Sequence, residues 1–207
     1  LLGRPIANLG LIFEEIESIP SEEVCVQLSR DIPLLTKVDV TSTDLNVGNI
    51  DVCWMRPDAL ALDTVLNSGP YLYGLRLAEG QTTNGSAFSE VTTFERPFFN
   101  EPVDTCYSDT GLNTEGKAYS YRIELIVENE NNPIGEGQAA TTVRLSGSPT
   151  DNAHELNWTS MTPWTNVRYD LLRKVPGSST FDFLTTTSDQ LFRDADLENG
   201  DDYCYSS

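Results

Sequence analysis

Two stretches of this chain share a pattern in which an apolar leucine precedes a Tyr-x-Tyr pair by six or seven residues. The first copy consists of Leu112 and residues 119–121, and the second consists of Leu197 and residues 203–205. An internal repeat decides the architecture of a chain before any other signal does. The pattern therefore predicts two copies of one structural unit.

The segments before each copy repeat in the same order. A strand-like run ends at Trp54 in the first copy and at Trp158 in the second, and a tyrosine-centred apolar run follows each of them, at 71–75 and 169–172. β-branched and aromatic residues alternate with polar ones over short runs, and Gly, Pro, Asn and Asp interrupt them about every ten residues, as in antiparallel sandwiches. No window keeps the period of a long helix. The sequence predicts an all-β protein.

The expected strands can be placed by residue number. In the first unit they cover 36–43, 48–56, 71–77, 88–94, 104–108, 118–128 and 138–145, and in the second they cover 154–159, 167–174, 181–186 and 191–193, with one more beginning at 202. Residues 147–149, Gly-Ser-Pro, are interpreted as a hinge between the units.

Three segments follow from this reading. Residues 33–145 form a full sandwich, and residues 146–207 form a partial one that lacks at least its last edge strand. Residues 1–30 are either the tail of a preceding sandwich or an independent extension. The chain is therefore interpreted as a piece of a longer protein.

Composition limits the classes of partner. Of 207 residues, 39% are hydrophobic, so the chain can bury a core, and the net charge is −19. Such a charge repels nucleic acid and anionic lipid, and it suits a solvated extracellular surface or cation binding. The longest uncharged apolar run, 8–13, is far shorter than the roughly 20 residues that a membrane helix requires. We expect neither nucleic-acid binding nor membrane insertion.

The repeated residues resemble the fibronectin type III pattern, in which a leucine packs under a tyrosine corner whose hydroxyl bonds back to the backbone. The resemblance implies tandem fibronectin type III (immunoglobulin-like) β-sandwiches, one complete and one partial. Several short stretches, among them 23–26, 30–33, 69–71 and 194–197, also resemble very large surface proteins of gliding Bacteroidota. Those proteins carry serial type III-like domains and leave the cell through the type IX secretion system.

This second resemblance has further implications. It implies an extracellular or cell-surface location, with neighbouring domains of the same long chain as partners. Further copies in a filament and components of the secretion system are other candidate partners. Asp63-Thr64-Val65 resembles the short O-glycosylation motif of Bacteroidota, which makes Thr64 a possible glycosylation site.

The four cysteines are consistent with an oxidising compartment and lack the C-x-x-C spacing of a zinc site. Cys53 and Cys106 are expected on the outward face of neighbouring strands, because Trp54 and Tyr107 beside them point inward. They are predicted to form a disulfide. Cys204 and Cys25 lie on open edges. Each is expected to face a cysteine on the missing strand of its own sandwich, or, alternatively, the segment of Cys25 completes the sandwich of another copy.

Candidate sites for chemistry are few. Loop carboxylates could serve acid–base catalysis or bind calcium, but neither acidic loop has the spacing of an EF-hand. These residues are Asp58, Asp63, Glu79, Glu128, Glu130, Asp194, Asp196, Asp201 and Asp202. The only histidine, His154, has no partner Ser or Cys nearby. Trp164 and Tyr169 are either core residues or a sugar-binding platform. We predict no catalytic site, no cofactor and no metal, with calcium as the alternative.

The leading functional hypothesis is a structural repeat, or spacer, of a large secreted cell-surface adhesin or filament protein. The alternatives are a type III-like accessory module of a secreted carbohydrate-active enzyme and a ligand-binding ectodomain. The sequence following these repeats in the parent protein discriminates among the three.

Overall fold

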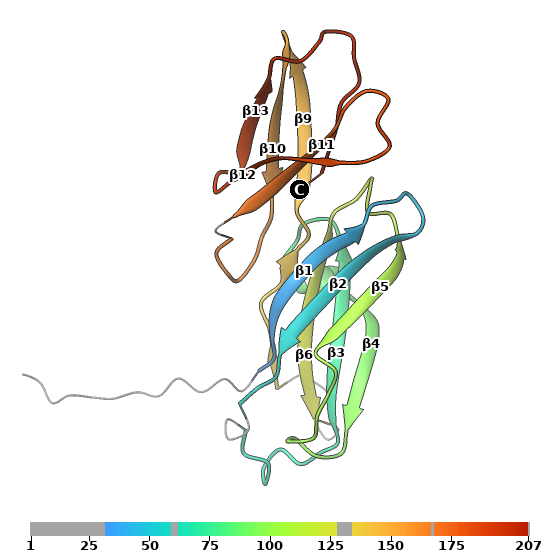
Figure 1. Ribbon diagram of the computed structural model, residues 1–207. Coiled ribbons are helices and arrows are strands. Elements are labelled where there is room, and N and C mark those ends of the chain that lie inside the picture. Colours follow the sequence, from blue (N-terminus) through green and yellow to red (C-terminus); the bar gives the residue numbers. More distant parts are fainter. Residues whose placement is uncertain (1–31, 59–61, 128–133, 167, 207) are drawn as a thin grey trace, which may run out of the picture.

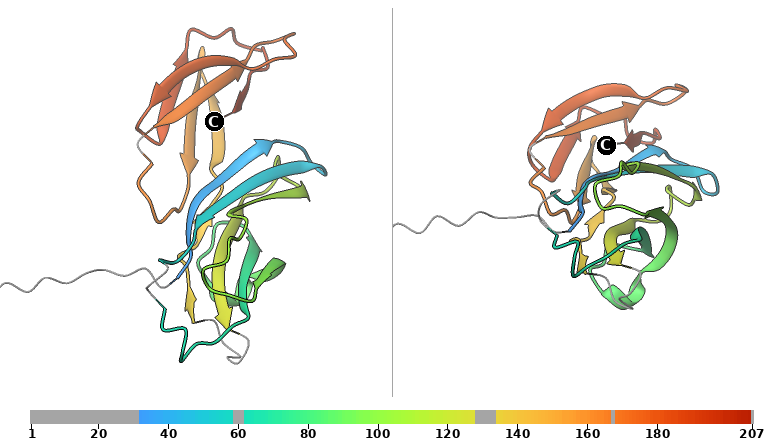
Figure 2. Two further views of the ribbon diagram at one scale, coloured as in Figure 1. Left: turned by 60° about the horizontal axis from the view of Figure 1, so that its bottom comes forward. Right: turned by 90° about the horizontal axis from the view of Figure 1, so that it is seen from below.

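The computed structural model describes residues 32–58, 62–127, 134–166 and 168–206. These residues form two β-sandwiches that follow one another along the chain and lie end to end (Figure 1). The left view of Figure 2 again shows the second sandwich beyond the end of the first, and the right view looks at the molecule from below. The described residues contain no α-helix, and only one turn of 3-10 helix, Gly85–Ala87.

The first sandwich contains β1 to β8. Their bounds are β1 Leu34–Ser42, β2 Gly48–Met55, β3 Tyr71–Glu79, β4 Ser89–Arg96, β5 Cys106–Leu112, β6 Tyr119–Val127, β7 Gly135–Glu136 and β8 Ala140–Thr141. One sheet has the order β1-β2-β5, and the other has the order β4-β3-β6-β7, with β8 also paired to β6. All of these pairings are antiparallel.

The second sandwich contains β9 to β14. Their bounds are β9 Arg144–Thr150, β10 Ala153–Thr159, β11 Tyr169–Lys174, β12 Asp182–Thr187, β13 Leu191–Ala195 and β14 Cys204–Ser206. One sheet has the order β13-β10-β9, and the other has the order β12-β11-β14. The strand order thus repeats that of the first sandwich up to β14.

This arrangement confirms the predicted fold class, tandem all-β sandwiches with the type III strand order. The alternation of buried and half-buried residues along β2 explains why the prediction was accurate. Ile50, Val52 and Trp54 are fully or almost fully buried, whereas Asp51 and Cys53 between them are half-buried on the opposite face. A strand with one face in a core shows this period of two.

Two sequence predictions at the boundary between the sandwiches were wrong. Residues 138–145 do not form one strand, because the last edge of the first sandwich is split into β7 and β8. The expected hinge at 147–149 lies inside β9, where Pro149 is the register partner of His154. Proline is tolerated there because β9 is an edge strand, which leaves part of its backbone free of ladder hydrogen bonds.

Each sandwich has its own core. That of the first joins buried residues from both sheets, including Trp54, Tyr73, Leu75 and Ile123. That of the second is smaller, and its buried members are Leu156, Trp158, Tyr169 and Leu171.

Residues 1–31 lie outside the described residues, and with them the predicted tail segment 1–30 and Cys25. Within the part of the chain that the structure describes, no helix is long and apolar enough to cross a membrane.

Candidate functional site

The tyrosine corner is present in both sandwiches. The hydroxyl of Tyr119 accepts a hydrogen bond from the backbone N–H of Asn113 at 3.1 Å, and that of Tyr203 accepts one from the N–H of Glu198 at 3.3 Å. The repeated leucine precedes each corner, as the resemblance implied. The first tyrosine of each Tyr-x-Tyr pair therefore has a structural role.

The second tyrosine of each pair binds a buried aspartate. Tyr121 donates to Asp109 at 2.8 Å, and Tyr205 donates to Asp194 at 2.8 Å. Burial raises the pKa of the Asp109 carboxyl above its usual value. Burial, followed by the nearby aspartate, raises the pKa of Tyr121 and of Tyr205. Both phenols therefore stay protonated and act as hydrogen-bond donors.

The second sandwich adds two charged or polar partners around its aspartate. Arg173 donates to both carboxylate oxygens of Asp194 at 2.9 Å. His154 Nδ1 lies 3.0 Å from the hydroxyl of Tyr205. Since that hydroxyl gives its only proton to Asp194, it accepts from His154, whose Nδ1 therefore carries a hydrogen. His154 thus belongs to a structural network.

The predicted disulfide between Cys53 and Cys106 is present. The two residues lie directly opposite each other on β2 and β5, with their Cα atoms 4.1 Å apart. Trp54 N donates to Thr105 O next to them, so the cysteines form a pair without ladder hydrogen bonds of their own. Cys204 is free and exposed.

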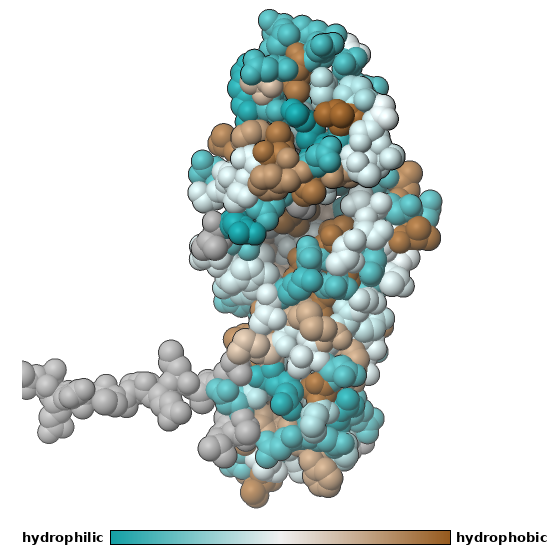
Figure 3. Space-filling view, viewed as in Figure 1, coloured by the Kyte–Doolittle hydropathy of each residue, from teal (hydrophilic) through white to brown (hydrophobic). Residues whose placement is uncertain are grey.

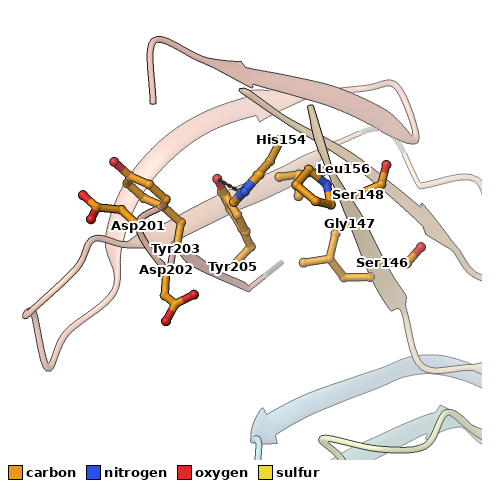
Figure 4. A pocket seen from close by; sticks show the side chains of 11 residues that line it. Ser146, Gly147, Ser148, His154, Leu156, Asp201, Asp202, Tyr203 and Tyr205 are labelled. Atoms are coloured by element: carbon orange, nitrogen blue, oxygen red, sulfur yellow. Dashed lines mark hydrogen bonds between the residues drawn. The ribbon is translucent and has the colours of Figure 1, made fainter. Parts of the chain in front are cut away.

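A groove of about 460 Å³ lies between β9 and the start of β14 (Figure 4). Ser146, Ser148 and His154 line one side, and Tyr203 and Tyr205 line the other. The groove exposes the side of β14 that no described strand covers. It holds one histidine and two exposed aspartates, and we find in it no arrangement of nucleophile and base.

The contact region between the two sandwiches, called the joint below, includes a set of hydrogen bonds around Gln81. The Gln81 amide donates to the backbone oxygen of Thr142 at 3.1 Å and to that of Thr159 at 2.8 Å. Its own oxygen accepts from the Thr159 hydroxyl at 2.9 Å. One side chain therefore links the turn after β3, the end of β8 and the end of β10.

A loop of the second sandwich continues the joint along the edge of β8. Thr141 N donates to Met161 O at 2.8 Å, and Met161 N donates to the Thr141 hydroxyl at 2.8 Å. Trp164, on the same loop, packs against the core of the first sandwich. Arg144, the first residue of β9, donates to Glu115 O at 2.8 Å, in the loop that follows β5. The joint thus combines hydrogen bonds to the backbone with apolar contact.

A hollow lies beside the joint. Val38 and Thr114 from the first sandwich and Leu145 and Tyr205 from the second are among its lining residues. In the space-filling view, apolar residues gather near this region of the molecule (Figure 3).

The candidate acids do not converge on one site. Asp63 accepts from the backbone N–H groups of Val65 and Leu66, Glu79 pairs with Lys117, and Asp194 is buried in its ion pair. Asp58, Asp196, Asp201 and Asp202 are exposed, and Glu128 and Glu130 lie outside the described residues. No group of three potential metal ligands occurs among the described residues.

The remaining candidates are also placed. Tyr169 is buried and contacts Trp158, with ring centroids 5.4 Å apart, so it belongs to the core. Trp164 is half-buried at the joint, and its Nε1 donates to Asn166 at 2.9 Å. The two aromatic residues therefore form no exposed platform. Thr64 is exposed in the loop that Asp63 caps.

Sequence reasoning missed the buried aspartates and the joint. Asp194 was grouped with the loop acids, although the repeat aligns it with Asp109, three residues before Leu197 as Asp109 is before Leu112. That alignment was the available signal for a shared buried role. Nothing in the local sequence of Gln81 or Met161 marks them as joint residues.

Comparison with protein-family models and with curated proteins found no match to this chain.

Proposed function

We propose that this chain is a pair of structural repeats that act as a spacer in a large secreted cell-surface adhesin or filament protein. The observation that carries the proposal is the joint. Two hydrogen bonds between Gln81 and Thr159, the paired bonds between Thr141 and Met161, and the packing of Trp164 hold one sandwich against the next. A spacer must hold its length, and a joint of this kind limits bending.

Other features support the location in the proposal. A disulfide such as Cys53–Cys106 persists in oxidising compartments, which include the cell surface. A net charge of −19 suits a surface exposed to solvent. The resemblance to surface proteins of gliding Bacteroidota supports export through a type IX system, and exposed Thr64 is the proposed site of O-glycosylation.

The test measures whether the two sandwiches move as one body. Residual dipolar couplings from the two sandwiches of the wild-type chain should fit one alignment tensor, and small-angle X-ray scattering should give one extended shape. Gln81→Ala removes the two hydrogen bonds to Thr159, each with a net contribution of about 1 kcal/mol, and should separate the two tensors.

Gln138→Ala is the matched control. Gln138 is an exposed glutamine between β7 and β8, and its side chain makes no hydrogen bond among the described residues. It should leave the couplings unchanged. Independent tumbling of the two sandwiches in the wild-type chain would refute the spacer role.

A further inference from the structure

A pocket of about 600 Å³ lies on the second sandwich, at the end that faces the first. Two segments enclose it: the loop between β10 and β11, which reaches toward the first sandwich (Figure 1), and the turn between β12 and β13. We call it the loop pocket. Its volume is in the range of pockets that hold small molecules. It shares no lining residue with the groove beside β14 or with the hollow beside the joint.

Hydrogen bonds within the protein orient the amide side chains of the loop pocket. Trp164 Nε1 donates to Asn166 Oδ1 at 2.9 Å, and Asn166 Nδ2 donates to Ser160 Oγ at 3.3 Å. On the other side, Gln190 Nε2 donates to the hydroxyl of Tyr169 at 3.1 Å. Because these side chains are already ordered, little of their conformational entropy remains to be lost when a ligand binds.

The loop that carries Trp164 is held in place by the joint. Met161 exchanges two hydrogen bonds with Thr141 of the first sandwich, and Trp164 packs against the core of that sandwich. Within the loop, the Thr162 hydroxyl donates to Trp164 O at 2.7 Å. The loop pocket is therefore preformed in the linked pair of sandwiches.

Several polar groups of the loop pocket remain available to a ligand. The Asp189 backbone N–H donates to Thr187, but its carboxylate accepts no hydrogen bond from the described residues, and neither does Gln190 Oε1. The hydroxyl-bearing residues Thr165 and Ser188 are exposed. None of the described residues that line the pocket is Lys, Arg or His. The pocket therefore offers acceptors and hydroxyls, and no cation.

This set of groups fits a neutral ligand that carries several hydroxyls. Each hydroxyl of a sugar can both donate and accept, so carboxylate and amide oxygens beside protein hydroxyls match it. The ring of Trp164 supplies an apolar surface for the C–H groups of a sugar. The net charge of −19 disfavours an anion. A cation would find one exposed carboxylate, Asp189, and such exposed charge pairs contribute little.

We propose that the loop pocket binds a short neutral oligosaccharide. Asp189 and Gln190 Oε1 accept hydrogen bonds from adjacent sugar hydroxyls, and Trp164 packs against the ring. This inference goes beyond the spacer function and does not depend on it. A repeat with such a site holds a neutral glycan beside the joint as well as setting a distance.

The test uses the ¹⁵N-labelled full chain and nuclear magnetic resonance. The probes are five neutral disaccharides: cellobiose, maltose, lactose, mannobiose and chitobiose. The chain has three tryptophans, so it gives three indole N–H signals, and the Trp164→Phe variant identifies the one that belongs to the pocket. With at least one sugar, the indole signal of Trp164 and the side-chain amide signals of Asn166 and Gln190 should shift along one saturating curve. The expected dissociation constant is about 1 mM or lower.

The other two tryptophans are internal controls. Trp54 and Trp158 are almost fully buried in the two cores and do not line the loop pocket, so their indole signals should stay in place. No saturable shift of the Trp164 signal with any of the five sugars would overturn the proposal. Equal shifts of all three indole signals would show a general effect of the sugar on the solution, and would overturn it too.

A pair of variants tests the role of the carboxylate. Asp189→Ala should weaken sugar binding about tenfold, a loss typical of a hydrogen bond to a charged group. Asp182→Ala is the matched control, because it removes the same charge from an exposed position of the same sandwich outside the pocket. It should bind the sugar as the wild type does. Equal weakening by the two variants would mean that binding follows net charge, and would refute the site.

Titration with choline separates a sugar site from a cation site. A saturable shift of the Trp164 signal with choline and none with the sugars would assign the loop pocket to cations and overturn the proposal. Failure of the sugar site is distinguishable from failure of the spacer function. A chain whose two sandwiches share one alignment tensor, but whose Trp164 signal ignores every sugar, would refute the sugar site alone.

Discussion

Removal of the Cys53–Cys106 disulfide should destabilise the first sandwich and leave the second almost unchanged. The bond closes a loop between residues 53 positions apart in the sequence. In the chain-entropy model, a loop of this length raises the free energy of unfolding by about 4 kcal/mol at 25 °C. The perturbation is the double variant Cys53→Ser, Cys106→Ser, in which one half-buried and one exposed side chain are replaced by residues of similar size.

The magnitude can be converted into measured quantities. For a sandwich of about 110 residues the entropy of unfolding is about 0.23 kcal/mol/K, so a loss of 4 kcal/mol lowers the melting temperature by about 17 °C. Urea unfolding followed by hydrogen-exchange mass spectrometry assigns the change to a sandwich. Peptides from β3 and β6 should lose protection, whereas peptides from β10 and β11 should keep it.

Cys204→Ser is the control, because that cysteine is free and exposed. It should move neither transition. If the double variant unfolded at the same urea concentration as the wild type, the entropic account of this disulfide would be refuted. If peptides of both sandwiches lost protection together, the sandwiches would unfold as one cooperative unit.

Three further variants test the buried aspartates and the repeated turn. Burial raises the pKa of the Asp109 carboxyl in the folded state. The contribution of this carboxyl to stability is therefore greatest below its unfolded pKa of about 3.8, and it is lost as the pH rises through the folded pKa. In urea unfolding, the wild type should therefore gain stability relative to Asp109→Asn as the pH falls from 7 toward 4. Arg173→Ala leaves the Asp194 carboxylate buried without its cation and should cost the second sandwich about 3 kcal/mol in urea unfolding, whereas a cost below 0.5 kcal/mol would show that the pair contributes little. Gly111 has a left-handed backbone (φ 78°), and a Cβ added there would meet open space. Gly111→Ala should therefore lower the free energy of unfolding by about 1 kcal/mol in the same assay, and this loss comes from the backbone conformation alone.

The strands and their faces could be predicted because each is a local pattern with a period of two. The alternation around Trp54 placed Cys53 outward, and that placement, combined with the same reasoning at Tyr107, located the disulfide. The repeat gave a second, independent reading of the same strands. The strand order itself was implied by the resemblance of both copies to the fibronectin type III pattern.

The boundary between the sandwiches could not be predicted in the same way. Gly147, Ser148 and Pro149 are typical of a turn, but the ladder to β10 holds them in an edge strand. The joint itself depends on Gln81 reaching residues about 60 and 78 positions away along the chain. Such contacts depend on how two folded units meet, and no local pattern encodes them.

The paired hydrogen bonds between Thr141 and Met161 have a consequence for biosynthesis. As the chain leaves the ribosome, the first sandwich can fold before Met161 is available, so the outer edge of β8 is exposed for a time. An unprotected edge is where strands of neighbouring nascent chains add and aggregate. The second sandwich therefore protects this edge of the first, and slow translation between residues 141 and 161 would lengthen the time for which the edge is exposed.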